Sequence, residues 1–162
     1  MTSIFKIRLN QIFFIVFGIS ALILILSFTA EYFWELPACL LCKLQRIPYF
    51  LLIANSLIGI FSILKTGCLR TIQLLLIGSF FLASFHTLVE YGKVRTSCQR
   101  NMQMETLEDF KLILVAEPKC SESSWKLLGL PASLYNATLS LFIVFCICFF
   151  QKLNKINNIF KN

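Results

Sequence analysis

The sequence predicts an all-α membrane protein whose fold is a four-helix transmembrane bundle. Hydrophobic residues make up 57% of the 162 residues and charged residues only 14%, which is too apolar for a soluble domain of this length. Four apolar runs are long enough to cross a bilayer, which takes roughly 20 residues of helix. The runs lie at about residues 12–30, 47–64, 71–89 and 132–150. We expect residues 1–162 to form one membrane domain, with extracytoplasmic loops at about 31–46 and 92–130.

The first run follows Lys6 and Arg8, which gives it the basic start of a cleavable signal peptide. Its apolar core is longer than the roughly 7–15 residues of a signal, and three more spans follow it. We therefore expect it to stay in the mature protein as a helix. It ends in the aromatic-rich residues 31–35, which are typical of a membrane interface. The second run begins near Pro48, which a first helical turn tolerates because its amides lack intrahelical partners.

The third run follows a short segment, residues 65–70, that we expect to be the turn between two antiparallel helices. Its polar residues gather toward its outer end and include His86. Ionisable residues in membrane helices normally face the bundle interior or a polar cavity, so His86 is a candidate site residue. The alternative is a histidine that only packs at the interface.

The second outer loop contains residues 106–115, in which apolar side chains recur at helical spacing. Thr106 and Asp109 make a plausible start for that helix. The segment is too short to span a membrane, so we expect a short amphipathic helix that lies on the outer surface of the bilayer. A lid helix packed on the first loop is the competing interpretation.

Basic residues distinguish the two sides of the membrane. Residues 1–11, 65–70 and 151–162 hold seven Lys or Arg and no acid, whereas all eight acidic residues lie on the opposite side or at its membrane edge. Basic density in short loops marks the cytoplasmic side, so both termini are predicted to be cytoplasmic. The net charge of +7 is explained by this topology, and we expect no nucleic-acid partner.

Four of the seven cysteines belong to the outer loops, namely Cys39, Cys42, Cys98 and Cys120. An oxidising compartment would allow them to form two disulfides. The other three lie in the cytoplasmic turn, where a thiol stays reduced, or inside the fourth span, where cysteine packs as a small apolar residue. The outer four are therefore the candidates for chemistry.

Cys39 and Cys42 have the CxxC spacing that serves both thiol redox sites and zinc sites. Cys98 and Cys120 are separated by 21 residues, whereas a zinc half-site has roughly two to four, so the spacing favours redox chemistry. A membrane zinc-site or scaffold protein that uses the four outer cysteines as ligands is the alternative. In the redox interpretation we expect Cys42 to be the thiolate, because it lies near a helix start and one turn before Arg46.

The combination resembles the DsbB family of bacterial disulfide-forming membrane proteins. The features that carry the resemblance are four spans, cytoplasmic termini, Cys39-x-x-Cys42-x-x-x-Arg46 in the first outer loop and a second loop pair. Residues 120–130 also resemble the family's segment before the last helix. The resemblance implies a multi-pass protein of the bacterial inner membrane with periplasmic cysteine loops. It would reoxidise a thioredoxin-like dithiol protein of the DsbA type and pass the electrons to a membrane quinone, either ubiquinone or menaquinone.

The resemblance also implies a role for each cysteine. Cys39 and Cys42 would be the quinone-coupled pair, with Cys42 facing the quinone. Cys98 would form the mixed disulfide with the partner, and Cys120 would bridge transiently to Cys39. Two further side chains would lie at the quinone, Arg46 and His86.

Overall fold

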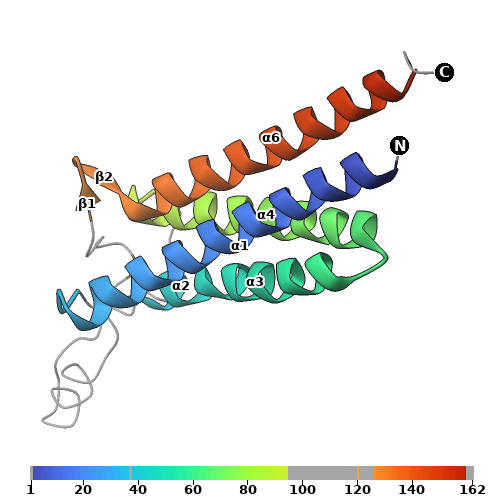
Figure 1. Cartoon of the computed structure of the whole chain (residues 1–162). Coiled ribbons are helices and arrows are strands. Elements are labelled where there is room, and N and C mark those ends of the chain that lie inside the picture. Colours follow the sequence, from blue (N-terminus) through green and yellow to red (C-terminus); the bar gives the residue numbers. More distant parts are fainter. Residues whose placement is uncertain (1, 37, 95–119, 121–125, 160–162) are drawn as a thin grey trace, which may run out of the picture.

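The computed structural model describes residues 2–36, 38–94, 120 and 126–159, without the side chains of residues 2–8, 127 and 153–159. Its long helices are α1 (Thr2–Tyr32), α3 (Arg46–Phe61), α4 (Lys65–Glu90) and α6 (Ala132–Ile159). Within these described residues, four helical segments are long and apolar enough to cross a membrane. The start of α1 and the end of α6 lie at the same end of the bundle (Figure 1). The predicted four-helix transmembrane bundle is confirmed.

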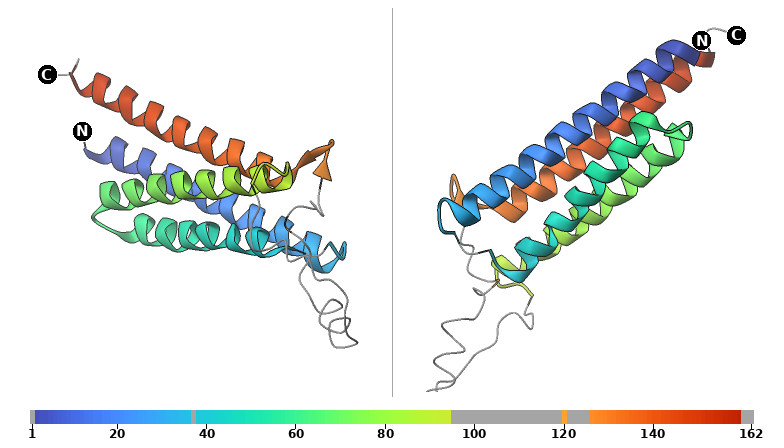
Figure 2. Two further views of the ribbon diagram at one scale, coloured as in Figure 1. Left: turned by 180° about the vertical axis from the view of Figure 1, so that it is seen from behind. Right: turned by 60° about the horizontal axis from the view of Figure 1, so that its bottom comes forward.

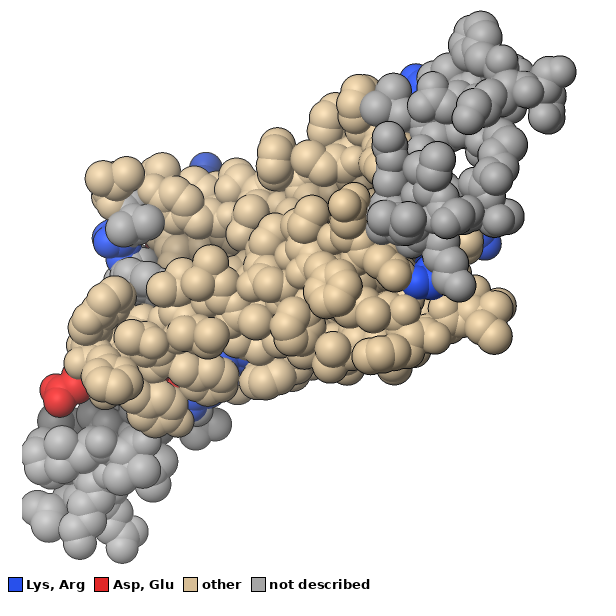
Figure 3. Space-filling view, in the orientation of Figure 1, with Lys and Arg blue, Asp and Glu red and all other residues tan. Residues whose placement is uncertain are grey.

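Neighbouring helices pack in the order α1, α3, α4 and α6, as the further views in Figure 2 show. Their contacts bury a core that includes Phe13, Leu52, Ile72 and Leu76, each with no exposed side-chain surface. Large apolar side chains also cover the outside of the bundle, as expected where the surrounding solvent is lipid. In the space-filling view the middle of the visible face is uncharged, and the charged side chains lie mostly toward its two ends (Figure 3).

Gly59 allows α1 and α3 to approach closely. A Cβ at this position would lie 2.6 Å from the ring of Phe13, which is fully buried. Small residues at such contacts are typical of membrane helices, whose association depends on close packing. The glycine therefore lets the Phe13 ring of α1 pack directly against the backbone of α3.

The turn between α3 and α4 lies at residues 62–64, so the expectation that residues 65–70 form it was wrong. Those residues begin α4 instead. The Lys65 ammonium donates to the carbonyl of Ile60 at 3.2 Å and to the side chain of Asn10, which accounts for its burial. The hydroxyl of Ser62 accepts the backbone N–H of Leu64 at 3.0 Å. The contacts at Ile60 and Leu64 satisfy backbone groups that the helix ends leave unpaired.

The end of the bundle opposite to the termini, called the outer end below, carries three short elements (Figure 1): helix α2 (Leu40–Leu44) and the two strands β1 (Lys126–Leu127) and β2 (Leu130–Pro131). The strands pair antiparallel across Leu128 and Gly129, whose φ angles are +52° and +80°. Two successive positive φ values are typical of a tight hairpin turn. The hairpin leads directly into α6. The predicted amphipathic helix at 106–115 lies outside the described residues.

Candidate functional site

The two cysteines of the CxxC sequence are in contact at the outer end of the bundle. Cys39 is the N-cap of α2, and its sulfur accepts the backbone N–H of Cys42 at 3.3 Å. The Cys39 thiol also donates to the Cys42 sulfur at an Sγ–Sγ distance of 3.0 Å. The first turn of α2 therefore brings the two sulfurs to a separation from which a small side-chain movement would form a disulfide.

Cys39 holds its proton more tightly than an ordinary thiol. Its hydrogen bond to Cys42 and its burial raise its pKa from 9.0 to about 12, against a smaller opposing effect of a hydrogen bond from His86. The largest cause acts on the protonated form, because removing the proton costs the bond that the thiol donates. In the reduced pair, Cys39 is therefore the hydrogen-bond donor and Cys42 the acceptor.

This arrangement predicts the pH dependence of Cys39 alkylation. In a reduced variant that keeps only Cys39 and Cys42, we expect the rate to rise with pH and its midpoint to lie near 12. Cys42→Ala removes the largest cause, so the midpoint should fall toward 9.0. The measurement is the rate of reaction with a neutral alkylating reagent, followed by mass spectrometry of the labelled peptide. An unchanged midpoint in the Cys42→Ala protein would contradict this account.

His86 reaches the cysteine pair from α4. Its side chain is buried, with Nε2 3.5 Å from the Cys39 sulfur and Nδ1 2.9 Å from the side-chain nitrogen of Gln45. Glu90 lies one turn further along α4, with Oε1 3.7 Å from the same Nε2. The other carboxylate oxygen of Glu90 accepts a hydrogen bond from Ser133 of α6. The structure thus places His86 between a thiol and a nearly buried carboxyl group.

Arg46, the first residue of α3, is held by one face of α1. Its Nε donates to the Ser27 hydroxyl at 2.8 Å, and its guanidinium forms an ion pair with Glu31. The guanidinium carbon also lies 4.6 Å from the centre of the Phe28 ring. The sequence predicted a cation near Cys42 but gave no sign of these partners. Cys42 and Arg46 both line one pocket, which lies between α1 and α6.

Cys120 lies in the same buried cluster as Cys39, together with Leu41 and Val89. Only 1% of its surface is exposed. The structure therefore brings one cysteine of the second loop to the CxxC pair, although 77 residues lie between Cys42 and Cys120. Cys98, the other predicted loop cysteine, lies outside the described residues.

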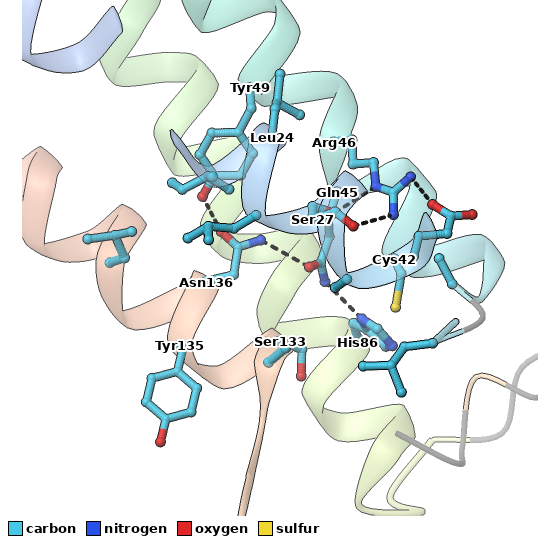
Figure 4. Close-up of a pocket in the computed structure, with 18 of the residues that line it drawn as sticks. Leu24, Ser27, Cys42, Gln45, Arg46, Tyr49, His86, Ser133, Tyr135 and Asn136 are labelled. Carbon is cyan, nitrogen blue, oxygen red and sulfur yellow. Dashed lines mark hydrogen bonds and ion pairs between the residues drawn. The ribbon is translucent and has the colours of Figure 1, made fainter. Parts of the chain in front are cut away.

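A pocket of about 250 Å³ opens beside the cysteines. It is lined by α1 on one side and α6 on the other, and by residues of α3 and α4 between them (Figure 4). Leu26, which lines it, is 46% exposed on the outside of the bundle, so the pocket reaches the lipid-facing surface. Cys42 lines this pocket. The polar lining residues include Ser27, Glu31, Gln45, Arg46, His86, Glu90, Ser133, Tyr135 and Asn136.

Several of these polar residues were not candidates from the sequence. Gln45 falls in the spacer between Cys42 and Arg46, Asn136 falls inside an apolar run, and Glu90 directly follows the predicted span at 71–89. Their common signal is a strongly polar side chain within or at the edge of a membrane helix, which usually faces a cavity. Applied to every span, that signal would have found them.

The same geometry also suits a metal ion. The ligand atoms of Cys39, Cys42 and His86 lie within 4.8 Å of one another. Thiolate and imidazole are ligands that Zn²⁺ prefers, although a structural zinc site normally uses four protein ligands. This donor set differs from the predicted alternative of four outer cysteines, because it includes a histidine.

The comparisons with known proteins identify the family of the chain. The sequence model of a family described as "Disulfide bond formation protein DsbB" matches residues 9–150. The chain is also 28% identical over 161 residues to the uncharacterized protein RP370 of Rickettsia prowazekii (strain Madrid E), a match that covers 93% of this chain and 94% of the relative. No solved structure gives a significant match. The chain belongs to the DsbB family of membrane disulfide oxidoreductases.

Proposed function

We propose that this protein oxidises a periplasmic dithiol protein of the thioredoxin-like DsbA type and passes the electrons to a membrane quinone. The observation that carries the proposal is the position of Cys42 within the CxxC pair, where it lines a pocket that reaches the lipid-facing surface. In the overall reaction the partner's two thiols become a disulfide, and two electrons and two protons convert the quinone to a quinol. Both ubiquinone and menaquinone fit this scheme.

The pocket suits a quinone ring in size and chemistry. Its volume of about 250 Å³ exceeds the ~150 Å³ that suffices for benzene in an engineered protein cavity. Apolar side chains of α1 form part of the wall, and the Arg46 guanidinium supplies N–H groups for a ring oxygen. His86 lines the same pocket beside Cys39. When bound, the quinone supplies the two-electron acceptor. Cys42 would face it, and Arg46 would stabilise negative charge that develops on a ring oxygen.

The second cysteine pair would connect this site to the soluble partner. Cys120 packs in one cluster with Cys39, which supports a transient disulfide between them. Thiol–disulfide exchange would then pass oxidising equivalents from the CxxC pair to the pair formed by Cys98 and Cys120. Cys98 would form the mixed disulfide with the partner.

We further propose that the cysteine end of this single membrane domain faces the periplasm and that both termini are cytoplasmic. The support is the concentration of basic residues in the two terminal segments and near the turn between α3 and α4. This orientation places the outer cysteines in the oxidising compartment, where disulfides form.

The proposal is tested with the purified protein in detergent, a soluble ubiquinone analogue and a reduced DsbA-type protein. We expect loss of the quinone absorbance and formation of one partner disulfide per quinone reduced. Thiol counting and metal analysis of the same preparation distinguish this enzyme from the alternative, a metal-site or scaffold protein. Four free outer cysteines with stoichiometric zinc and no quinone reduction would show a metal-site or scaffold protein instead.

A further inference from the structure

A chain of side-chain hydrogen bonds runs through the bundle to His86 from residues of two other segments. The Tyr49 hydroxyl of α3 donates to Asn136 Oδ1 of α6. Asn136 Nδ2 donates to Gln45 Oε1 at 3.0 Å, and Gln45 Nε2 lies 2.9 Å from His86 Nδ1 (Figure 4). Tyr49 and His86 are each 2% exposed and Gln45 is 9% exposed, whereas Asn136 is partly buried where it lines the pocket.

The chain has a direction, because an amide nitrogen can only donate and an amide oxygen can only accept. Asn136 presents its nitrogen to Gln45, so the oxygen of Gln45 is engaged and its nitrogen points at His86. The Nδ1 atom of His86 must therefore accept and carries no proton. In a neutral imidazole the proton is then on Nε2, the nitrogen that faces Cys39 and Glu90.

We infer that Gln45, oriented by Asn136, is a positioning residue that fixes the tautomer of the His86 imidazole, with its proton on Nε2. The opposite tautomer would direct an N–H at the Gln45 amide nitrogen, and two donors would face each other. Reversing the whole chain requires both amides to turn and takes from the Tyr49 hydroxyl its acceptor on Asn136, which leaves it only the Ser140 hydroxyl at 3.5 Å. The tautomer of His86 is thus set by Asn136 of α6, which acts through Gln45.

The tautomer of His86 affects the sulfur of Cys39. That sulfur is within reach of two N–H groups, the backbone amide of Cys42 at 3.3 Å and Nε2 of His86 at 3.5 Å. Both stabilise negative charge on Cys39 when it acts as a thiolate, and the high pKa of Cys39 makes that help necessary. His86 is a hydrogen-bond donor to Cys39 in this arrangement. This role rests on the proposed dithiol oxidation, whereas the tautomer does not.

The tautomer can be measured directly because His86 is the only histidine in the chain. Protein labelled with ¹⁵N-histidine gives NMR signals from one imidazole, and protonated and unprotonated ring nitrogens resonate far apart. In the reduced wild-type protein at neutral pH we expect a protonated Nε2 and an unprotonated Nδ1. A proton on Nδ1, in either the opposite tautomer or the imidazolium, would overturn the inference without any variant.

Two nearly isosteric variants test the chain itself. Gln45→Glu places an acceptor opposite Nδ1, and Asn136→Asp turns the Gln45 amide so that its oxygen faces Nδ1. Both should move the proton to Nδ1, and both should lower kcat for quinone reduction by about tenfold with an unchanged KM for the dithiol partner. Gln73→Glu is the matched control, because Gln73 bonds Gln151 on a distant part of α4 and α6 and should change neither readout.

The outcomes separate this inference from the proposed function. A wild-type protein with the expected tautomer but no quinone reduction would refute the function and leave the hydrogen-bond chain standing. An active enzyme whose His86 keeps its proton on Nε2 in both folded variants would refute the positioning role. Helical content, measured by circular dichroism, verifies that each variant is folded, and the wild-type tautomer decides the inference if a variant does not fold.

Discussion

Replacing Cys42 with serine should abolish quinone reduction by this protein, with turnover lowered on the order of 10⁴-fold or more. The reason is that Cys42 belongs to the contacting sulfur pair and lines the pocket proposed for the quinone. A serine hydroxyl has nearly the same shape, but it cannot form a disulfide with Cys39. The measurement is the loss of quinone absorbance in the presence of reduced DsbA-type partner.

The same assay applied to Cys39→Ser should give an equally complete loss, because the disulfide needs both sulfurs. Cys146→Ser is the matched control, since Cys146 is exposed on α6 and does not line the pocket. It should retain wild-type turnover. Wild-type rates in either Cys39→Ser or Cys42→Ser would refute the disulfide relay.

Arg46→Met should lower quinone reduction by about 10²-fold while thiol–disulfide exchange with the partner at Cys98 continues. Arg46 lies at the pocket wall, and methionine keeps much of its apolar contact with Phe28 but removes the charge. A fixed cation stabilises negative charge most strongly in a site that is shielded from water. Here that charge develops on the quinone ring as it is reduced. The two steps are measured separately, by quinone absorbance and by trapping the mixed disulfide with a partner that has one active-site cysteine.

The ion pair with Glu31 requires a control for this experiment. Arg46→Met leaves the Glu31 carboxylate, only 20% exposed, without its cation, which by itself destabilises the outer end of α1. The double variant Glu31→Gln with Arg46→Met removes both charges and should regain stability but not quinone reduction. Equal loss of quinone reduction and partner exchange in the double variant would mean that Arg46 is structural.

The sequence by itself determined the four spans and the residues that could carry the chemistry. Length and hydropathy identify a membrane helix because each crossing needs a long run of apolar side chains. The two cysteines of the CxxC sequence, Cys39 and Cys42, are in contact in the structure. The reason is that a helical turn brings residues three positions apart close together. The functional roles predicted for Arg46, His86 and the four cysteines stay predictions, although the structure gathers all of these residues except Cys98 at one end.

Only the tertiary structure decided which side chains meet there. Gln45 contacts His86 and Asn136 across 41 and 91 residues of sequence, and Arg46 meets Ser27 across 19. The pocket between α1 and α6 also follows from how the helices pack. Hydropathy could not reveal these contacts, because lipid and the bundle interior are both apolar. The lipid-facing and inward-facing sides of a membrane helix therefore have similar hydropathy. Polar residues inside the spans mark the inward side, but their partners are fixed only when the helices come together.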